Sequence, residues 1–454
     1  MKHIDRSFDI ALLLVFAGVC LAPAGATAAL RVATFDIDAT PPVGSHMAYD
    51  PVTNKWDLGL RARGVVLLGA GAPIVLCAVD WIGIANEGQD VFRGALARAA
   101  GTKSSRVALH TLHQHDAPDC DFSAERILKQ AGMDPLQYEG TFHRQVLSNL
   151  VAAVAEALPR AQPVTHLGLG EARVERVASN RRIFGADGKV CCVRYTACKD
   201  AELRAAPEGT IDPIVSVVSL WNGEKPVAAL SYYATHPQSY YRTGIPNPDF
   251  PGLARFHRDL AVPKALHVHF NGAGGNIGAG KYNDGAPTNR WSLAQRLEEG
   301  MRQAWANTKR NTIEATAIDW TVETVALPPS KHLDALEQMG KFTTQWEASR
   351  VAWLRRCRAG HKVEVACLKL GRARILHMPG ELFVEYQLAA KAHRPDLFVA
   401  MAAYGDYAPW YIGTAVAYEE GGYETEPRSS NVAPAVEGVL MGAIKKLLGD
   451  RPGK

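Results

Sequence analysis

The sequence has 454 residues, of which 47% are hydrophobic and 21% charged, and its formal net charge is +4 at pH 7. This is the composition of a globular protein that can bury a large core, in one large domain or two closely packed ones. Lys and Arg are scattered rather than clustered, so the charge pattern gives no reason to expect a nucleic-acid partner, and we predict none.

Residues 1–28 are predicted to be a secretory signal peptide. Lys2 and Arg6 precede an apolar run over residues 10–21, and Ala26-Thr27-Ala28 matches an A-x-A cleavage pattern. The run is shorter than the roughly 20 residues that a membrane span needs, so no stable transmembrane segment is expected after processing. The mature chain, residues 29–454, is therefore expected to be secreted or periplasmic.

Cysteine usage fits an exported protein but fixes no disulfide pairing. Disulfides are permitted outside the reducing cytoplasm, and their connectivity cannot be deduced from sequence. The group at positions 191, 192 and 198 lacks the second pair of a typical zinc spacing, so these are expected to be structural loop cysteines. After removal of the signal peptide the cysteines are Cys77, Cys120, Cys191, Cys192, Cys198, Cys357 and Cys367.

The first part of the mature chain alternates predicted strands and helices. The segment GVVLLGAGAPIVLCAVDWIGI, from Gly64, predicts a strand, a turn and a second strand that ends at Asp80. A helix is expected over residues 90–100, and the run RVALHTLHQH at 106–115 is expected to be a strand. Apolar residues that recur at three and four predict another helix over 138–157.

Later segments repeat the pattern of an apolar run that leads into polar residues. Two β-rich runs joined at Asn222-Gly223 predict a hairpin, which ends at His236. ALHVHFNGAGGNIGAG leads into a glycine-rich loop, and residues 291–308 are expected to be a helix. RARILHMPGELFVEYQLAAKA passes from strand to helix, DLFVAMAAYGDYAPWYIGT passes from strand to an aromatic loop, and APAVEGVLMGAIKKLLGD is helix-like. We predict the α/β class, a mixed β-sheet core with flanking helices and a site at the strand ends.

The stretch HTLHQHDAP, at 110–118, places three histidines close together. If the strand continues, His113 and His115 project to one face and His110 to the other. The first two can bind a divalent ion or divide the work between ligation and proton transfer; structural packing is the alternative. His236 and Glu381 also follow apolar runs, and two histidines with a glutamate form a recurring catalytic zinc set.

Together these segments resemble the N-terminal catalytic domain of the neutral/alkaline (non-lysosomal) ceramidases. The family's HTHSGP motif is similar to HQHDAP, from His113 to Pro118, and its A-x-H-P segment to ATHP at His236. Its PGEPF segment is similar to PGELF at Glu381, and Y-[VI]-x-T…Y-E to YIGTAVAYEEGGYE from Tyr411. The segments occur in the same order over most of the mature chain. The resemblance covers no C-terminal immunoglobulin-like domain, and none is expected here.

The resemblance implies that a zinc ion is held by His113, His236, Glu381 and Tyr411. A tyrosinate ligand is chemically reasonable, because a divalent ion favours the deprotonated phenol. Tyr407 is the alternative if the register of the loop differs. Without the resemblance, a packed aromatic side chain would be the preferred interpretation of Tyr411.

The resemblance also implies roles for residues beside the metal. His115 is placed next to the ion, for proton transfer or for binding a substrate carbonyl. Arg181, from the family's Asn-Arg pair, is placed in the substrate site, with a surface charge as the alternative. Asp116 stands where the family has a serine and is expected to orient an imidazole.

The glycine-rich loop departs from the family. Where the ceramidases have G-x-A-G-D-V-S-P-N, the sequence has GAGGNIGAGKYNDG, which places Asn276 on the aspartate and Gly278 on the serine. No serine acyl-enzyme is therefore expected. Asn276 and the backbone N–H groups of the loop are predicted to stabilise an oxyanion. Gly278 and Lys281 are predicted to contact the substrate, and the alternative for Lys281 is a turn. The loop lacks the P-loop spacing, so nucleotide binding is not expected.

These patterns predict an exported, zinc-dependent hydrolase in which zinc-activated water attacks an amide or related linkage of a small-molecule or lipid-like substrate. The alternatives are a genuine neutral ceramidase that uses water alone, a non-catalytic binding protein stabilised by metal, and a structural extracellular protein.

Overall fold

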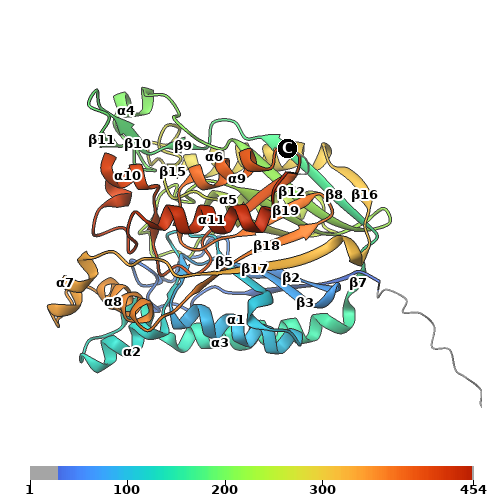
Figure 1. The fold of residues 1–454 in the computed structure, drawn as a ribbon, viewed down its shortest axis with the longest axis horizontal. Coiled ribbons are helices and arrows are strands. Elements are labelled where there is room, and N and C mark those ends of the chain that lie inside the picture. Colours follow the sequence, from blue (N-terminus) through green and yellow to red (C-terminus); the bar gives the residue numbers. More distant parts are fainter. Residues whose placement is uncertain (1–28, 452–454) are drawn as a thin grey trace, which may run out of the picture.

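The computed structural model describes residues 29–451, so the predicted signal peptide lies outside the described residues. The described chain forms three larger β-sheets that share one core and carry helices on their outer faces (Figure 1). The predicted mixed α/β class is confirmed. Within residues 29–451, none of the helices combines the length and apolarity that crossing a bilayer requires.

The first sheet has the strand order β5-β3-β2-β1-β7. Helices α1 (Glu87–Ala100) and α3 (Gly140–Ala157) pack on its outer face, below β2 and β3 in Figure 1. β5 runs parallel to β3, and the other pairs are antiparallel. The predicted strand, turn and strand unit and both helices are confirmed. The strands are β1 (Arg31–Asp38), β2 (Arg61–Gly69), β3 (Gly71–Val79), β5 (Val107–Thr111) and β7 (Gln162–Pro163).

The second sheet has the order β14-β13-β12-β8-β16, with β14 parallel to β13. Asn222 pairs with Lys225, and Gly223 adopts a φ of +57°, so the predicted hairpin is confirmed. Helix α6 (Thr288–Ala306) confirms the predicted helix, and α5 (Asp249–Ala261) was not predicted. The strands are β8 (His166–Arg173), β12 (Ile214–Asn222), β13 (Lys225–Tyr233), β14 (Leu266–Asn271) and β16 (Lys309–Thr312).

The third sheet contains β17 (Ile318–Val325), β18 (Val363–Leu370), β19 (Ala373–His377) and β21 (Phe398–Ala402), with β21 parallel to β19. Helices α9 (Val384–His393) and α11 (Val436–Leu448), both predicted, pack on it. An unpredicted insertion between β17 and β18 holds α7 (His332–Gln338) and α8 (Gln345–Arg358). In Figure 1 it lies beside α2 (Phe122–Gln130), against which α8 packs.

Short elements complete the described chain. Four two-stranded sheets pair β4 (Gly83–Ile84) with β6 (Asp119–Cys120), β9 (Ser179–Asn180) with β15 (Ile277–Gly278), β10 (Arg182–Phe184) with β11 (Val190–Val193), and β20 (Glu381–Leu382) with β22 (Tyr411–Ile412). Helices α4 (Ala201–Ala205) and α10 (Ala415–Glu420) lie in connections. The seven cysteines of the described chain are all free thiols.

The carboxyl ends of β5, β14 and β21, one from each large sheet, meet at the centre of the molecule. The N–H of Ala403 donates to the carbonyl oxygen of Asn271 (2.9 Å), and the N–H of Thr111 donates to that of Tyr404 (3.0 Å). The Asn271 amide donates to the carbonyl oxygen of Leu112 (2.5 Å). Segments that are far apart in the sequence therefore leave their strands at one place, and their polar side chains gather there.

Candidate metal centre

His113 and His115 lie in the loop after β5 rather than in the strand. β5 ends at Thr111, and His113 has a φ of +65°, outside the β region. The two histidines do lie close together, but they are not on a strand. The prediction that strand alternation brings them to one face is therefore wrong. His110 faces away from them, as predicted, and its Nε2 lies 3.0 Å from Nδ1 of His377.

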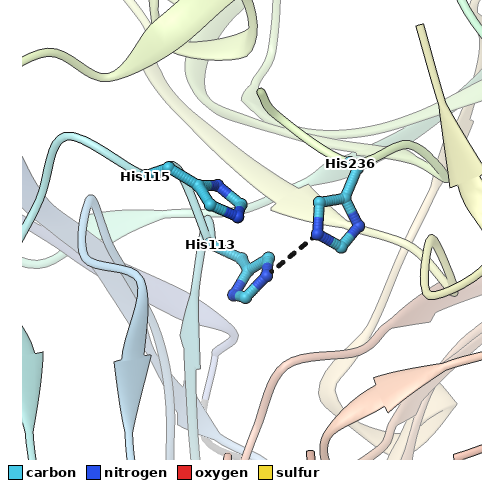
Figure 2. Close-up of side chains that lie close together, drawn as sticks. All are labelled: His113, His115 and His236. Carbon is cyan, nitrogen blue, oxygen red and sulfur yellow. Dashed lines mark hydrogen bonds between the residues drawn. The ribbon is translucent and has the colours of Figure 1, made fainter. Parts of the chain in front are cut away.

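The structure brings His113, His236, Glu381 and Tyr411 together. His113 Nε2 lies 3.1 Å from His236 Nε2, the contact dashed in Figure 2, and 3.2 Å from Glu381 Oε2. His236 Nε2 lies 3.5 Å from Glu381 Oε2 and 3.5 Å from the Tyr411 hydroxyl. Glu381 and Tyr411 are opposite each other in the parallel pair of β20 and β22. We call these four residues the ligand cluster.

The two histidines turn their Nε2 atoms toward each other. Nδ1 of His113 lies 2.7 Å from the carbonyl oxygen of Ile82, and Nδ1 of His236 lies 3.2 Å from that of Gly274. Because a carbonyl oxygen only accepts, each Nδ1 carries a proton, and in the neutral form of each ring Nε2 is then the atom with the lone pair that a metal needs. Oε2 of Glu381 is buried beside them without a hydrogen-bond partner among the described residues. Three electron-rich atoms this close favour a cation between them.

The donor set fits a zinc ion. At bond lengths of about 2.0–2.1 Å, tetrahedral ligand atoms are roughly 3.3–3.4 Å apart, which agrees with the 3.1–3.5 Å found here. Burial, with Arg181 and the neighbouring histidines, lowers the pKa of His236 well below its usual value, which favours the neutral imidazole that a metal needs. Burial raises the pKa of Tyr411 far above its usual value, so this phenol would ionise only beside a cation.

Tyr407 holds the carboxylate of Glu381 in place. Its hydroxyl donates to Oε1 (2.9 Å), which leaves Oε2 directed at the histidines. The ring of Tyr404 stacks on His113 with 4.7 Å between ring centroids. Tyr411 rather than Tyr407 therefore lies against His236, as in the first of the two predicted arrangements.

Gly275 gives a way to move Glu381 without removing a ligand. A β-carbon at this position would lie 2.3 Å from the carbonyl oxygen of Glu381. Gly275→Ala is therefore expected to displace Glu381 and to weaken zinc binding roughly 10–100-fold, as measured by competition with a chromogenic chelator. Gly442→Ala in α11, where the added carbon meets nothing within 4 Å, is the matched control and should leave the affinity unchanged. Equal affinities in the two variants would contradict the prediction.

His115 adds a third imidazole beside the ligand cluster. Nitrogen atoms of His113, His115 and His236 lie within 4.8 Å of one another, and Figure 2 shows the three rings facing a common space. Nδ1 of His115 is buried without a hydrogen-bond partner among the described residues, and its ring stacks on Tyr49 (6.0 Å, 5°). Burial, His113 and Arg181 lower its pKa well below the usual value, so the ring is neutral.

Arg181 packs on the ring of Tyr411. Its guanidinium carbon lies 5.2 Å from the ring centroid, its Nε donates to Glu424 (3.1 Å), and its Nη2 donates to the carbonyl oxygen of Gly275 (2.5 Å). Burial alone would lower the pKa of Arg181. Tyr411 and Glu424 raise the pKa by more than burial lowers it, so the net shift is upward. Arg181 is thus a buried permanent cation that lines the cavity described below, and the surface-charge alternative is wrong.

Asn276 is committed to the start of α9. Its Nδ2 donates to both carboxylate oxygens of Glu385 (2.9 and 3.2 Å), and its Oδ1 accepts the N–H of Val384 (2.9 Å). Asn276 is not among the residues that line the cavity. Its predicted role in stabilising an oxyanion gains no support from this position.

Three other predicted residues also make structural contacts. A β-carbon at Gly278 would lie 2.5 Å from Thr196 Cγ2, so no side chain fits there. Lys281 Nζ donates to three carbonyl oxygens at the end of α4, at 2.6–3.3 Å. Neither residue lines the cavity. Asp116 accepts the N–H and hydroxyl of Thr243, so the prediction that it orients an imidazole is wrong.

The ligand cluster opens into a cavity of about 500 Å³ with an aromatic wall. Eight of the residues that line it are Tyr or Trp, including Tyr49, Trp346 and Trp410. No motif in the sequence marks Tyr49, Trp346 or Arg350 as residues of this cavity. The aromatic run before Tyr411 was the only signal for this wall.

The fold and the ligand cluster define an α/β protein with a buried centre of the kind that holds a metal, where three sheets meet. No family model matches the sequence, and no curated protein is similar to it in sequence. Two solved structures have a similar fold: a ceramidase complexed with C2 (TM-score 0.67) and a neutral ceramidase from Pseudomonas aeruginosa (TM-score 0.66). Each is 17% identical, and the matches cover 93% of this chain and 75% and 74% of theirs. The resemblance predicted from the motifs is thus confirmed for the fold.

Proposed function

We propose that the protein is a zinc-dependent hydrolase that cleaves an amide or related linkage. The observation that carries this proposal is the ligand cluster, whose neighbouring donor atoms lie 3.1–3.5 Å apart at a cavity. The fold shared with ceramidases supports the same class of reaction. A zinc ion held by these four residues would polarise a carbonyl group and lower the pKa of a water molecule.

The remaining polar residues have separate tasks in this proposal. Backbone carbonyl oxygens hold the rings of His113 and His236 through their Nδ1 atoms. The two Nε2 atoms therefore already point at the metal position before an ion binds. His115 exchanges a proton with the substrate at Nδ1, which no described residue occupies. Arg181 keeps a positive charge beside Tyr411 and binds a substrate oxygen.

Cleavage of ceramide itself is the second candidate, and the shared fold favours it. With no side-chain hydroxyl at Gly278 and no room for one beside Thr196, this activity would have to use water as the nucleophile. We also propose that the protein is exported, that residues 1–28 are removed, and that residues 29–454 form the catalytic domain.

Zinc removal and a His115 variant test the proposal together. Purified protein is expected to hold one equivalent of zinc and to hydrolyse a member of a panel of chromogenic amides, esters and glycosides. Labelled ceramide in the same panel tests the second candidate. Chelation should abolish turnover, and added zinc should restore it. His115→Asn should retain zinc but lose roughly 10²–10⁴-fold in turnover.

His393→Asn, at the exposed end of α9, is the matched control and should change neither quantity. A protein without stoichiometric zinc, or turnover that survives chelation, would contradict the proposal. A protein that holds zinc but hydrolyses nothing in the panel would instead be the non-catalytic binding protein.

A further inference from the structure

Arg350, on α8, is a buried cation without an acidic partner. Its residue is 8% exposed, and no carboxylate oxygen of the described residues lies within 4.0 Å of its guanidinium. Its hydrogen bonds go to neutral acceptors: Nε donates to Asn431 Oδ1 (2.9 Å), and Nη2 donates to His332 Nε2 (2.5 Å) and to the carbonyl oxygen of Pro427. Buried charges in proteins are normally paired, so a buried guanidinium without an acidic partner is unusual.

The ionisable neighbours of Arg350 do not neutralise it. Glu347 precedes it on the same helix, but its carboxylate accepts the N–H groups of Thr343 (2.6 Å) and Thr344 (3.3 Å) and thereby caps α8. Burial and Arg350 lower the pKa of His332 to about 4, so this ring is neutral and accepts a hydrogen bond from Arg350 without offsetting its charge. Burial also lowers the pKa of Arg350 to about 10, and Glu347 offsets only part of that effect.

Arg350 lines the same cavity as the ligand cluster and has a spare donor there. The other two arginines of the cavity are paired, Arg181 with Glu424 (3.1 Å) and Arg428 with Glu426 (2.5 Å). Nη1 of Arg350, by contrast, makes no hydrogen bond with any described residue. The cavity therefore offers one unpaired guanidinium nitrogen, Nη1, to a ligand.

A wall of aromatic rings joins His115 to Arg350. Tyr49 stacks on His115, Trp346 lies 5.9 Å from Tyr49, and Trp410 lies 6.0 Å from Trp346. The guanidinium of Arg350 lies 5.2 Å from the ring of Trp410. None of the described residues that line the cavity is aliphatic. Such a wall suits a ring with polar substituents better than a long alkyl chain.

We propose, on the basis of the proposed function, that the substrate is an anionic compound that contains a ring. The ring stacks on Tyr49, Trp346 and Trp410, the anionic oxygens pair with Arg350, and the linkage to be cleaved lies at the histidines. The free Nη1 group can donate both of its hydrogens to the oxygens of a carboxylate or sulfate, and the charge of the guanidinium adds to the attraction, which makes Arg350 the specificity-determining residue. A neutral long-chain lipid would leave this charge unpaired.

The test compares two probes that differ only in charge, N-benzoylglycine and its neutral amide N-benzoylglycinamide. Because a carboxylate can also bind zinc, calorimetric titrations are made on chelated mature protein as well as on zinc-loaded protein. The unmodified chelated protein is expected to bind the anion about tenfold or more tightly than the amide. Inorganic sulfate should compete with the anion if the pocket accepts any such group, and should not compete if it accepts only carboxylates.

Arg350→Gln is expected to bring the ratio of the two affinities to about one, whereas the matched control Arg302→Gln, at an exposed residue of α6 that does not line the cavity, should leave the ratio unchanged. If Arg350→Gln does not fold, Arg350→Lys, which keeps the charge but has no Nη1 group to donate to the anion, should reduce the ratio. The inference would be overturned if the unmodified chelated protein bound both probes equally or did not bind N-benzoylglycine. It would also be overturned if substitutions of Arg350 left the ratio of the two affinities unchanged. A charge preference that persists in a protein without zinc or turnover would refute only the proposed function.

Discussion

The Glu381→Gln variant is expected to bind zinc roughly 10²–10³-fold more weakly than the unmodified protein. Apparent binding free energies of about 10–16 kcal/mol for four-ligand zinc sites correspond to roughly 2.5–4 kcal/mol for each ligand. Glutamine keeps the volume of the side chain and an oxygen that can accept the hydrogen bond from Tyr407. In the unmodified protein this bond joins the Tyr407 hydroxyl to Oε1 of Glu381 over 2.9 Å. The charged oxygen that lies 3.2 Å from His113 Nε2 is lost. Chelator competition at fixed pH measures the change.

The same substitution shows whether Glu381 is a metal ligand or a structural residue. Loss of a structural residue would destabilise the metal-free protein, whereas loss of a metal ligand should not. Oε2 of Glu381 is buried without a hydrogen-bond partner among the described residues, so removing its charge should leave the metal-free protein as stable as before or more so. Added zinc should then stabilise the unmodified protein more than the variant. Tyr407→Phe removes only the hydrogen bond to Oε1 of Glu381, and it should weaken zinc binding roughly 10–100-fold. Unchanged affinity in Glu381→Gln would exclude it as a ligand.

Local patterns in the sequence predicted those elements whose side chains follow a clear period or turn signal. The hairpin at Asn222-Gly223 and the strand pair that ends at Asp80 are examples. Helix α5 was missed because Pro251 in its first turn looks like a break, although proline is tolerated there. Helix α8 was missed because its arginines obscure the apolar period. The meeting of three sheets depends on contacts between distant strands, about which local periodicity carries no information.

The ligand cluster could be predicted from the family resemblance but not from geometry. Period-two alternation placed His113 on a continuing strand, whereas the chain leaves β5 after Thr111 and His113 adopts a positive φ. Convergence with His236 and Glu381 requires the parallel strand pairs of all three sheets. Arg350 could not be predicted as a cavity residue, since only the packing of the insertion between β17 and β18 brings it there.

Asp80→Ala is expected to lower the free energy of unfolding by roughly 3–5 kcal/mol, because it leaves a buried guanidinium without its partner. Arg255 on α5 donates Nη1 to Oδ1 (2.7 Å) and Nη2 to Oδ2 (2.6 Å) of Asp80, and both side chains are buried. Oδ2 also accepts the N–H of Arg61 (2.9 Å). Domains are typically stable by about 5–15 kcal/mol, so the loss should be plain in equilibrium urea unfolding of zinc-saturated protein.

Most of that loss should come from the unpaired charge rather than from the missing attraction, so Asp80→Ala with Arg255→Met should be less destabilised than Asp80→Ala alone. Glu299→Ala, which breaks an exposed pair with Arg302 on α6, is the matched control and should leave stability nearly unchanged. Asp80 directly follows β3, which pairs with the strand that leads to His113, and α5 packs on the sheet whose strand β13 leads to His236. The pair therefore joins two sheets that lead to residues of the ligand cluster, and we expect zinc affinity to fall together with stability in Asp80→Ala. A stable Asp80→Ala protein with normal zinc affinity would show that the sheets are held together without this pair.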